Sequence, residues 1–318
     1  MIEMNAPPAV VAWICSFLSD REQCVKYMST LSEWKNLTAG APQGTLLGPV
    51  LFLCMVNDAC QDSQYPSWKY VDDLSIFECR KAQDSSNMQN NVNELEHWTK
   101  ENKMKLNPKK CVVMNVSFMR SELISPKITI GNHELNEVTV VKLLGVLVQN
   151  DLKWNCHVDD IVRRASMRLH MLRILKGFRL PILDLVSIYC SYVRPVVEYC
   201  APVWHSGLTE KQKDQIERIQ RRACRLMLGP QYCSYSQALD SLRLPTLNCR
   251  REKLTLKLGR DLTKPQSPFN HWLPPTRSIA NSRVLRNGNM YSEIYCRTER
   301  YKRSALPYII RLLNANPV

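Results

Sequence analysis

Two adjacent carboxylates, Asp72 and Asp73, stand in the middle of a run of strand-forming residues. Tyr70 and Val71 precede them, and Leu-Ser-Ile-Phe follows at 74–77. Aromatic and β-branched residues favour a pleated, half-buried surface, whereas aspartate favours a turn. The run therefore predicts a tight hairpin with both aspartates at its tip.

Neighbouring carboxylates repel each other, and each costs free energy to desolvate unless a positive charge lies beside it. Mg²⁺ is the usual solution, because it takes one or two carboxylates, keeps waters and bridges substrate phosphates. Two such ions can clamp the attacking and leaving oxygens of a phosphoryl transfer. The pair thus indicates either a metal site for phosphoryl transfer or an ordinary exposed turn.

A second informative stretch lies upstream, where residues 40–52 read Gly-Ala-Pro-Gln-Gly-Thr-Leu-Leu-Gly-Pro-Val-Leu-Phe. Glycine allows a close backbone approach and proline fixes φ, so this loop can present a rigid backbone to a ligand. The apolar run after it, through residues 51–56, predicts a buried helix.

Taken together, Gly-x-Pro-Gln-Gly-Thr-x-x-Gly-Pro-x-Leu-Phe followed by Tyr70-Val71-Asp72-Asp73 resembles the reverse transcriptases of non-LTR (LINE-type) retrotransposons. The resemblance extends over most of the chain. It includes Trp13-Ile14-x-x-Phe17-Leu18-x-x-Arg21, Leu106-Asn107-x-x-Lys110, Leu143-Leu144-Gly145-Val146, Tyr192-x-x-x-Val196, Trp204 and Gln220-Arg221-Arg222-Ala223.

The resemblance implies template-directed DNA synthesis with an RNA template, a DNA primer, deoxynucleoside triphosphates and a two-metal Mg²⁺ site. Asp72 and Asp73 would hold the metal. Lys110 would lie near the incoming nucleotide, although a surface lysine beside Lys109 is the alternative. The residues expected to line the template, nucleotide and primer contacts are Pro42, Gln43, Gly44, Tyr70 and Val71.

The resemblance and the hydrophobic pattern together indicate an α+β fold. We expect a partial polymerase palm, an antiparallel sheet with packed helices, at 1–150. A helical thumb-like domain is expected at 151–230 and a helical or irregular basic linker at 231–318. The expected later elements are a helix from 155 to Gly177, a helical stretch at 181–205 split at Pro195, a helix capped by Thr209 and Gly229, a loop at 229–241, a helix at 241–260 and a short helix at 306–313.

The chain is strongly basic, with a formal net charge of +14 and a pI near 9.2. Such a balance indicates a polyanionic partner, nucleic acid first and acidic membrane second. Arginines at i, i+3, i+4 and i+7 suit a phosphate backbone, and few acids match them. An ordinary solvated helix face is the alternative. The arginines expected to track a nucleic-acid backbone are Arg163, Arg164, Arg168, Arg218, Arg221, Arg222 and Arg225.

One departure from the family pattern concerns the third carboxylate of the two-metal site. In relatives it precedes the Trp-Ile-x-x-Phe-Leu segment on an earlier strand, and this sequence has no Phe-Asp-type strand there. We therefore expect a polymerase segment that is inactive by itself. A non-catalytic RNA- or DNA-binding fragment and a degenerate element are the alternatives.

The remaining composition bears on the compartment. No run of about 18 apolar residues is present, and the N-terminus lacks the pattern of a signal peptide. The thirteen cysteines are odd in number and include no Cys-x-x-Cys spacing, which favours reduced thiols. We expect a nuclear or cytoplasmic protein that is not secreted.

Overall fold

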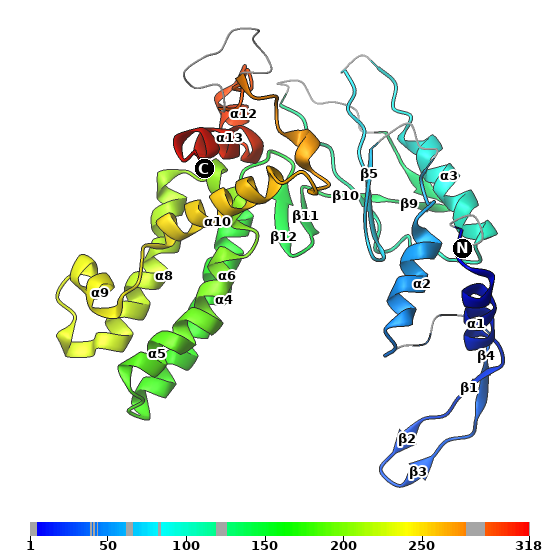
Figure 1. Cartoon of the computed structure of the whole chain (residues 1–318), viewed down its shortest axis with the longest axis horizontal. Helices are drawn as coiled ribbons and strands as arrows, with labels where there is room; N and C mark the ends of the chain where they lie inside the picture. Colours follow the sequence, from blue (N-terminus) through cyan, green and yellow to red (C-terminus); the bar gives the residue numbers. More distant parts are fainter. Residues whose placement is uncertain are drawn as a thin grey trace. The chain divides into compact units, whose positions relative to one another are not determined.

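The computed structural model describes residues 5–38, 40, 42, 44–61, 66–81, 84–118, 126–277 and 290–317. Contacts divide the chain into two compact units. The N-terminal unit comprises residues 1–113 and 119–137, and the C-terminal unit comprises residues 114–118 and 138–318. Short strand pairs and a few helices form the first unit, and helices dominate the second, which confirms the predicted α+β class (Figure 1). None of the described helices is both long and apolar enough to cross a membrane.

The N-terminal unit begins with helix α1 (Pro8–Leu18) and a two-stranded ribbon. Proline is tolerated in the first turn of α1 because no helical partner exists there for its missing N–H. The ribbon consists of two short antiparallel pairs in line. In it, β1 (Arg21–Gln23) pairs antiparallel with β4 (Lys35–Leu37), and β2 (Lys26–Tyr27) pairs with β3 (Thr30–Leu31).

Helix α2 (Leu47–Val56) follows the Pro42–Gly44 loop. The prediction that this helix is buried is wrong. Gly48 is buried, but Val50, Leu53 and Met55 retain 52%, 49% and 40% of their accessible surface. The reason is that, within the described part of the N-terminal unit, no second layer covers this apolar face.

Helix α3 (Met88–Glu101) packs on a small hairpin and forms the core of this unit. Val92 contacts the cluster that contains Ile128 and Ile130, and the side chain of Gln89 bonds both backbone groups of Thr129, at 2.8 and 2.9 Å. Gly131 and Asn132 form the turn of this hairpin, because Ile130 pairs with His133. The strands here are β8 (Thr129–Ile130), β9 (His133–Glu134), and the parallel pair β7 (Val112–Val113) and β10 (Asn136–Glu137).

The C-terminal unit opens with the hairpin of β11 (Val140–Leu143) and β12 (Val146–Gln149). This hairpin leads into α4 (Asn155–Gly177), whose bounds match the prediction. The hydroxyl of Tyr199 donates to the carbonyl of Leu144 at 2.8 Å, and the amide of Leu147 donates to Nδ1 of His157 at 3.3 Å. These bonds tie the hairpin to the helices, and the division between the two compact units falls before it, at 137/138.

The stretch at 181–205 is split, as expected from Pro195. A π-helical turn, η1 (Tyr189–Val193), precedes that proline, whose nitrogen cannot donate to the preceding turn. Cys200 has a φ of +51° and separates the last two helices. The helices are α5 (Ile182–Ile188), α6 (Arg194–Glu198) and α7 (Ala201–Trp204), followed by the 3₁₀ turn η2 (His205–Gly207).

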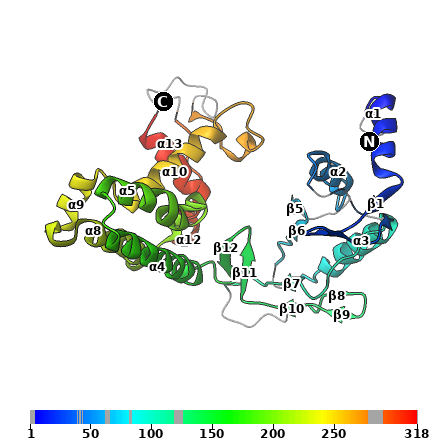
Figure 2. The same cartoon turned by 90° about the horizontal axis from the view of Figure 1, so that it is seen from below.

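Helix α8 (Glu210–Leu228) begins at the predicted capping box of Thr209 and Gln212 and ends at Gly229, whose φ is +57°. Its buried face meets that of α4 in one continuous core (Figure 2). The largest of the fully buried side chains in this unit are Trp204, Arg251, Tyr189, Ile161, Leu169, Leu172, Leu185, Ile216, Ile219, Met227, Leu247 and Ile310.

The region after Gly229 differs from the prediction of a loop and one helix. Two helices are present, α9 (Tyr235–Leu242) and α10 (Leu247–Leu262), separated by a turn at Arg243 (φ +52°) and by Pro245. Ser234 and Thr246 cap their N-termini, a signal that hydrophobic periodicity alone does not contain. The remaining elements are η3 (Gly229–Gln231), η4 (Asn270–Trp272), α12 (Glu299–Lys302) and α13 (Ala305–Ala315), the last close to the predicted 306–313.

Candidate active site and nucleic-acid interface

The predicted acidic hairpin is present as β5 (Ser67–Tyr70) and β6 (Asp73–Ile76). Tyr70 is paired with Asp73, so Val71 and Asp72 form the two-residue turn and Asp73 is the first residue of β6. Val71 has a φ of +55°, a region that β-branched residues rarely occupy. The turn is therefore tight and locally strained.

Both carboxylates are exposed, and neither has a hydrogen bond or ion pair with any described residue. The nearest lysine in the sequence, Lys69, points instead to the end of α2. Its Nζ donates to the carbonyls of Val56, Asn57 and Ala59, at 3.2, 2.6 and 2.7 Å. The described part of the unit thus holds the hairpin beside α2 while leaving the negative charges of the hairpin uncompensated.

The donor set fits one Mg²⁺ ion, because two carboxylates together with substrate phosphates are a common set of ligands for that metal. The part of the chain that the structure describes contains no group of three or more His, Cys, Asp or Glu side chains that could hold a metal. The described residues therefore fit a single ion and do not complete a two-metal site.

The loop before α2 is held by its own residues. The hydroxyl of Thr45 donates to the carbonyl of Pro42 at 3.0 Å and accepts from the amide of Gly48 at 3.1 Å. A Cβ on Gly48 would lie 2.7 Å from the Pro42 carbonyl oxygen, so that position requires glycine. Gly44 has a φ of +81°, which glycine adopts without strain. Gln43 lies outside the described residues.

The other predicted site residues are exposed. Tyr70 and Val71 retain 62% and 45% of their accessible surface beside the carboxylates. Lys110 is exposed in a turn whose amide donates to the carbonyl of Asn107 at 3.0 Å. No contact between described residues joins Lys110 to the acidic hairpin, so its role stays a prediction.

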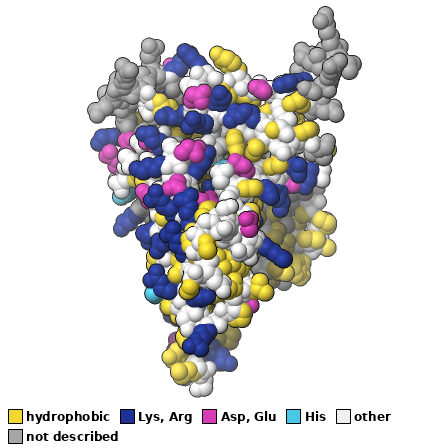
Figure 3. Space-filling view, turned by 90° about the vertical axis from the view of Figure 1, so that its left-hand side faces the viewer, with side chains coloured by type: hydrophobic (Ala, Val, Ile, Leu, Met, Phe, Trp, Pro, Cys, Tyr) yellow, Lys and Arg dark blue, Asp and Glu magenta, His cyan; other side chains and the backbone are white. Residues whose placement is uncertain are grey.

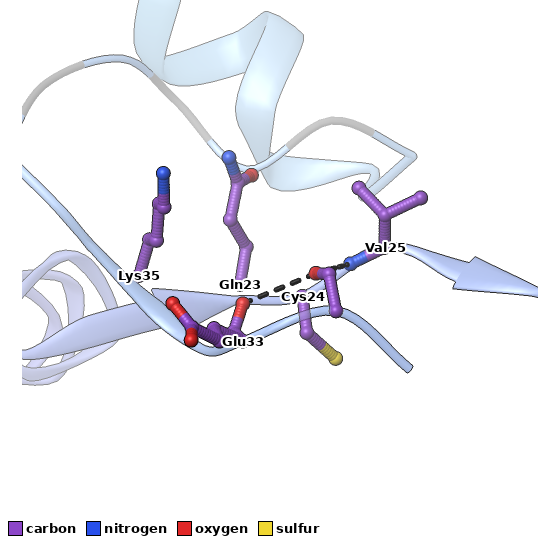
Figure 4. A pocket seen from close by; sticks show the side chains of 6 residues that line it. Gln23, Cys24, Val25, Glu33 and Lys35 are labelled. Carbon is purple, nitrogen blue, oxygen red and sulfur yellow. Dashed lines mark hydrogen bonds between the residues drawn. The ribbon is translucent and has the colours of Figure 1, made fainter. Parts of the chain in front are cut away.

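A cavity of about 390 Å³ lies elsewhere in this unit, on the ribbon of β1 to β4 (Figure 4). In Figure 4 the side chains of Gln23, Val25 and Lys35 point to one side of the ribbon, and Cys24 points to the other. None of the predicted catalytic or nucleotide-contacting residues lines this cavity. The tip of the acidic hairpin, from Tyr70 to Asp73, is instead exposed surface.

The seven arginines expected to contact nucleic acid all lie in the C-terminal unit. The expectation that few acids match them is wrong for four of the seven. Asp160 pairs with Arg163 and Arg164, at 2.7 and 2.8 Å. Asp214 pairs in the same way with Arg218 and Arg221, at 2.9 and 2.7 Å.

None of the other three arginines has an acidic partner among the described residues. The guanidinium of Arg225 lies 5.2 Å from the centroid of the Tyr232 ring. Arg168 donates to the carbonyl of Tyr192 at 2.5 Å and lies over its ring, whereas Arg222 reaches the hydroxyl of Ser166 across the α4–α8 contact. Positions 166 and 168 are two residues apart, about 200° around a helix. Arg168 therefore lies on a different face of α4 from the contact that Ser166 marks.

Sequence reasoning missed two features of these sites. Lys69 was not recognised as the anchor of the hairpin, because its acceptors are backbone carbonyls that carry no side-chain signal. Arg173 was not grouped with the other arginines, although it follows Ser166 by seven residues, a separation that repeats one helical face.

A family model described as reverse transcriptase (RNA-dependent DNA polymerase) matches residues 1–173 of the chain. Three similar proteins are from Drosophila melanogaster. The probable RNA-directed DNA polymerase from transposon X-element is 25% identical over 290 residues, which is 87% of this chain and 32% of that protein. The corresponding protein of transposon BS is 24% identical, over 86% of this chain and 31% of its own length.

The RNA-directed DNA polymerase from mobile element jockey is 23% identical over 79% of this chain and 28% of its own length. The chain thus spans about a third of the length of the curated relatives it matches. No solved structure matches it. Because the family model covers more than half of the 318 residues and the motifs agree with it, the chain belongs to the reverse transcriptase (RNA-dependent DNA polymerase) family, of the LINE type.

Proposed function

We propose that this chain is a segment of a retrotransposon RNA-directed DNA polymerase and that its β5–β6 hairpin carries two of the metal-binding carboxylates. The observation that supports this most is the state of Asp72 and Asp73. Both are exposed, adjacent and without a cationic partner among the described residues, while Lys69 holds the strand that leads to them. An unneutralised pair of this kind suits a divalent cation.

In the proposed reaction, the 3′-oxygen of a DNA primer attacks the α-phosphorus of a deoxynucleoside triphosphate. A new P–O bond forms, the bond from the α-phosphorus to the bridging oxygen breaks, and pyrophosphate leaves with the electron pair. Asp72 and Asp73 would hold Mg²⁺, which would supply positive charge at the reacting phosphate.

The residues of the chain would position the substrates. Tyr70 and Val71 flank the carboxylates and offer exposed apolar surface to the primer end. The Pro42–Gly44 backbone, fixed by Thr45, would contact the template and the nucleotide. Lys110 is proposed to assist proton transfer to the leaving group.

A third carboxylate is needed to fix two metals at the separation of ~3.5–4 Å that such a reaction uses. We propose that a further polymerase segment supplies it. The exposed apolar face of α2 supports this, because a face of that kind is stable only against another layer. The 318-residue chain by itself is expected to be inactive.

Primer extension on an RNA template with Mg²⁺ or Mn²⁺ tests the proposal. The chain alone should give no product, and a fusion to the N-terminal polymerase segment of a related protein should extend the primer. In that fusion, Asp72→Asn should abolish extension, because the amide keeps the shape and loses the charge. Activity that survives Asp72→Asn would show that the hairpin is not the metal site.

The second candidate function is a non-catalytic RNA- or DNA-binding fragment. It is favoured by the lack of a third metal-binding side chain among the described residues. The two functions differ in the fused protein, because a binding fragment would bind the template and still fail to extend the primer.

A further inference from the structure

Helices α4 and α8 lie side by side and run in the same direction. Four hydrogen bonds join them, and the residue numbers of the two partners rise together along the contact. We call this contact the seam. Its bonds are Gln212–Asn155 (2.7 Å), Gln215–Asp159 (2.8 Å), Arg222–Ser166 (3.5 Å) and Lys176–Met227 (2.8 Å).

Charge is unevenly distributed along the seam. Acids occur in the first part of each helix, and neither residues 161–183 nor residues 218–239 contain Asp or Glu. The acids Asp160 and Asp214 neutralise the arginines nearest to them, including Arg163 and Arg218. Further along, the helices carry only basic charges. Figure 3 shows Lys and Arg side chains continuing into the lower part of the drawn face, where few acidic ones remain.

On the later turns of α4 and α8 themselves, three exposed arginines have no acidic partner among the described residues: Arg173, Arg222 and Arg225. Arg222 marks the seam through its bond to Ser166. Arg173 lies two helical turns beyond Ser166 on the same face, about 10 Å along the axis. The guanidinium of Arg225 lies 5.2 Å from the ring centroid of Tyr232.

Concentrating like charges destabilises a compact unit, and an anionic ligand offsets that repulsion. The C-terminal ends of both parallel helices lie at the same end of the seam, where their dipoles offset part of the repulsion within the protein itself. The exposed guanidinium groups keep N–H donors that match phosphate oxygens, and sites for single-stranded nucleic acid combine such charges with aromatic side chains.

We propose that the later part of the seam, defined by Arg173, Arg222 and Arg225, is a phosphate-backbone site for single-stranded RNA. This site would bind the nucleic acid of the proposed polymerase. The choice of RNA as the ligand rests on that proposed function.

An exposed apolar stripe on α4 would suit a different partner, an acidic membrane. Met167, Met171, Ile174 and Phe178 retain 65%, 46%, 42% and 74% of their accessible surface. The stripe faces away from the seam, because Ile174 and Arg173 are consecutive and therefore about 100° apart around the helix. A flat surface that took the stripe would not engage the seam, so the arginines favour a strand of nucleic acid.

The test is fluorescence anisotropy of labelled single-stranded RNA titrated with the full chain at several salt concentrations. Changing Arg173, Arg222 and Arg225 to Ala should lower the slope of log affinity against log salt by about 2, because each phosphate contact on a single strand contributes about 0.7. The matched control changes Arg163, Arg218 and Arg221 to Ala. It removes the same formal charge but alters arginines that Asp160 and Asp214 already neutralise, so its slope should fall by less than half as much.

Equal changes in slope for the two triple variants would overturn the proposal, provided circular dichroism shows both folded. Phe178→Ser should leave RNA binding unchanged. A chain that instead binds vesicles of phosphatidylcholine and phosphatidylserine through Phe178, and not RNA, would establish the membrane as the partner. The assay needs no catalysis, so its failure leaves the primer-extension prediction intact, and the failure of primer extension leaves the seam in place.

Discussion

The Nζ atom of Lys69 lies 2.7 Å from the carbonyl oxygen of Ala59, just beyond the end of α2. Through this contact and two neighbouring carbonyls, one lysine fastens strand β5, which leads to Asp72, to the helix that follows the Pro42–Gly44 loop. Both motifs of the proposed active site are therefore joined by a side chain that belongs to neither.

Lys69→Ala should loosen the hairpin without altering its carboxylates. Removing the ammonium leaves three carbonyls with water alone, a loss of about 1 kcal/mol at an exposed site. Hydrogen exchange should become faster at the amides of residues 70–76 and at the end of α2. Lys105→Ala is the control, because Lys105 is exposed and has no bond with a described residue. Unchanged exchange in the Lys69 variant would show that the anchor is not needed.

Gly145 and Tyr199 form a close contact at the tip of the β11–β12 hairpin. Gly145 has a φ of +88°, and a Cβ there would lie 3.2 Å from the ring of Tyr199. Gly145→Ala should destabilise the C-terminal unit by about 1–3 kcal/mol, because it adds backbone strain to a close contact. Adding Tyr199→Ala should remove the steric part only, so a double-mutant cycle measured by urea unfolding should give a non-zero coupling. Additive effects would contradict the contact.

Glu217 is a buried carboxylate that caps α10. It accepts hydrogen bonds from the amides of Leu247 and Asn248, at 3.1 and 3.3 Å, and from the hydroxyl of Tyr235. Burial and the bond to Glu217 raise the pKa of Tyr235. Glu217→Ala should lower the free energy of unfolding by about 2–4 kcal/mol, because the amides at the N-terminus of α10 lose their acceptor. Tyr235→Phe should cost less, and an equal loss in both variants would contradict the capping role.

His205 and His157 should make the C-terminal unit sensitive to acid. Burial, followed by the charge of Arg251, lowers the pKa of His205 from 6.5 to about 3; burial, followed by the charge of Arg164, lowers that of His157 to about 4. Each Nδ1 accepts a hydrogen bond, from Nε of Arg251 at 3.2 Å and from the amide of Leu147 at 3.3 Å. Protonation would remove these acceptors.

The unfolded chain binds these protons at higher pH than the folded one, so stability is fully present above about pH 6.5 and falls as the pH drops toward 4. At pH 4, the protonation of each histidine in the unfolded chain lowers the free energy of unfolding by an amount on the order of 3 kcal/mol. Thermal melts from pH 7 to 4 measure the fall. His205→Asn keeps an acceptor for Arg251 but does not titrate, so its melting temperature should fall less steeply. A slope equal to that of the parent chain would contradict the assignment to His205.

Local patterns predicted those features that depend on neighbouring residues. Residues 70–77 contain the strand-forming residues and the aspartates that make a hairpin, and Thr209 and Gln212 close a capping box within one turn. The bounds of α4 followed in the same way from its apolar spacing, because its buried face repeats every three or four residues. The order of two short motifs in the sequence likewise indicated the protein family.

Only the tertiary structure decided which groups meet. Asp214 forms ion pairs with Arg218 and Arg221, whereas Arg173, Arg222 and Arg225 have no acidic partner among the described residues. The sequence alone could not separate the paired arginines from the unpaired ones. The sequence shows which face of a helix a residue occupies, because helical positions repeat periodically. It does not show which other helix packs against that face, or in which direction, and this decides the residue's partner. The burial of α2 was mispredicted for the same reason, because apolar residues are buried only where another layer covers them.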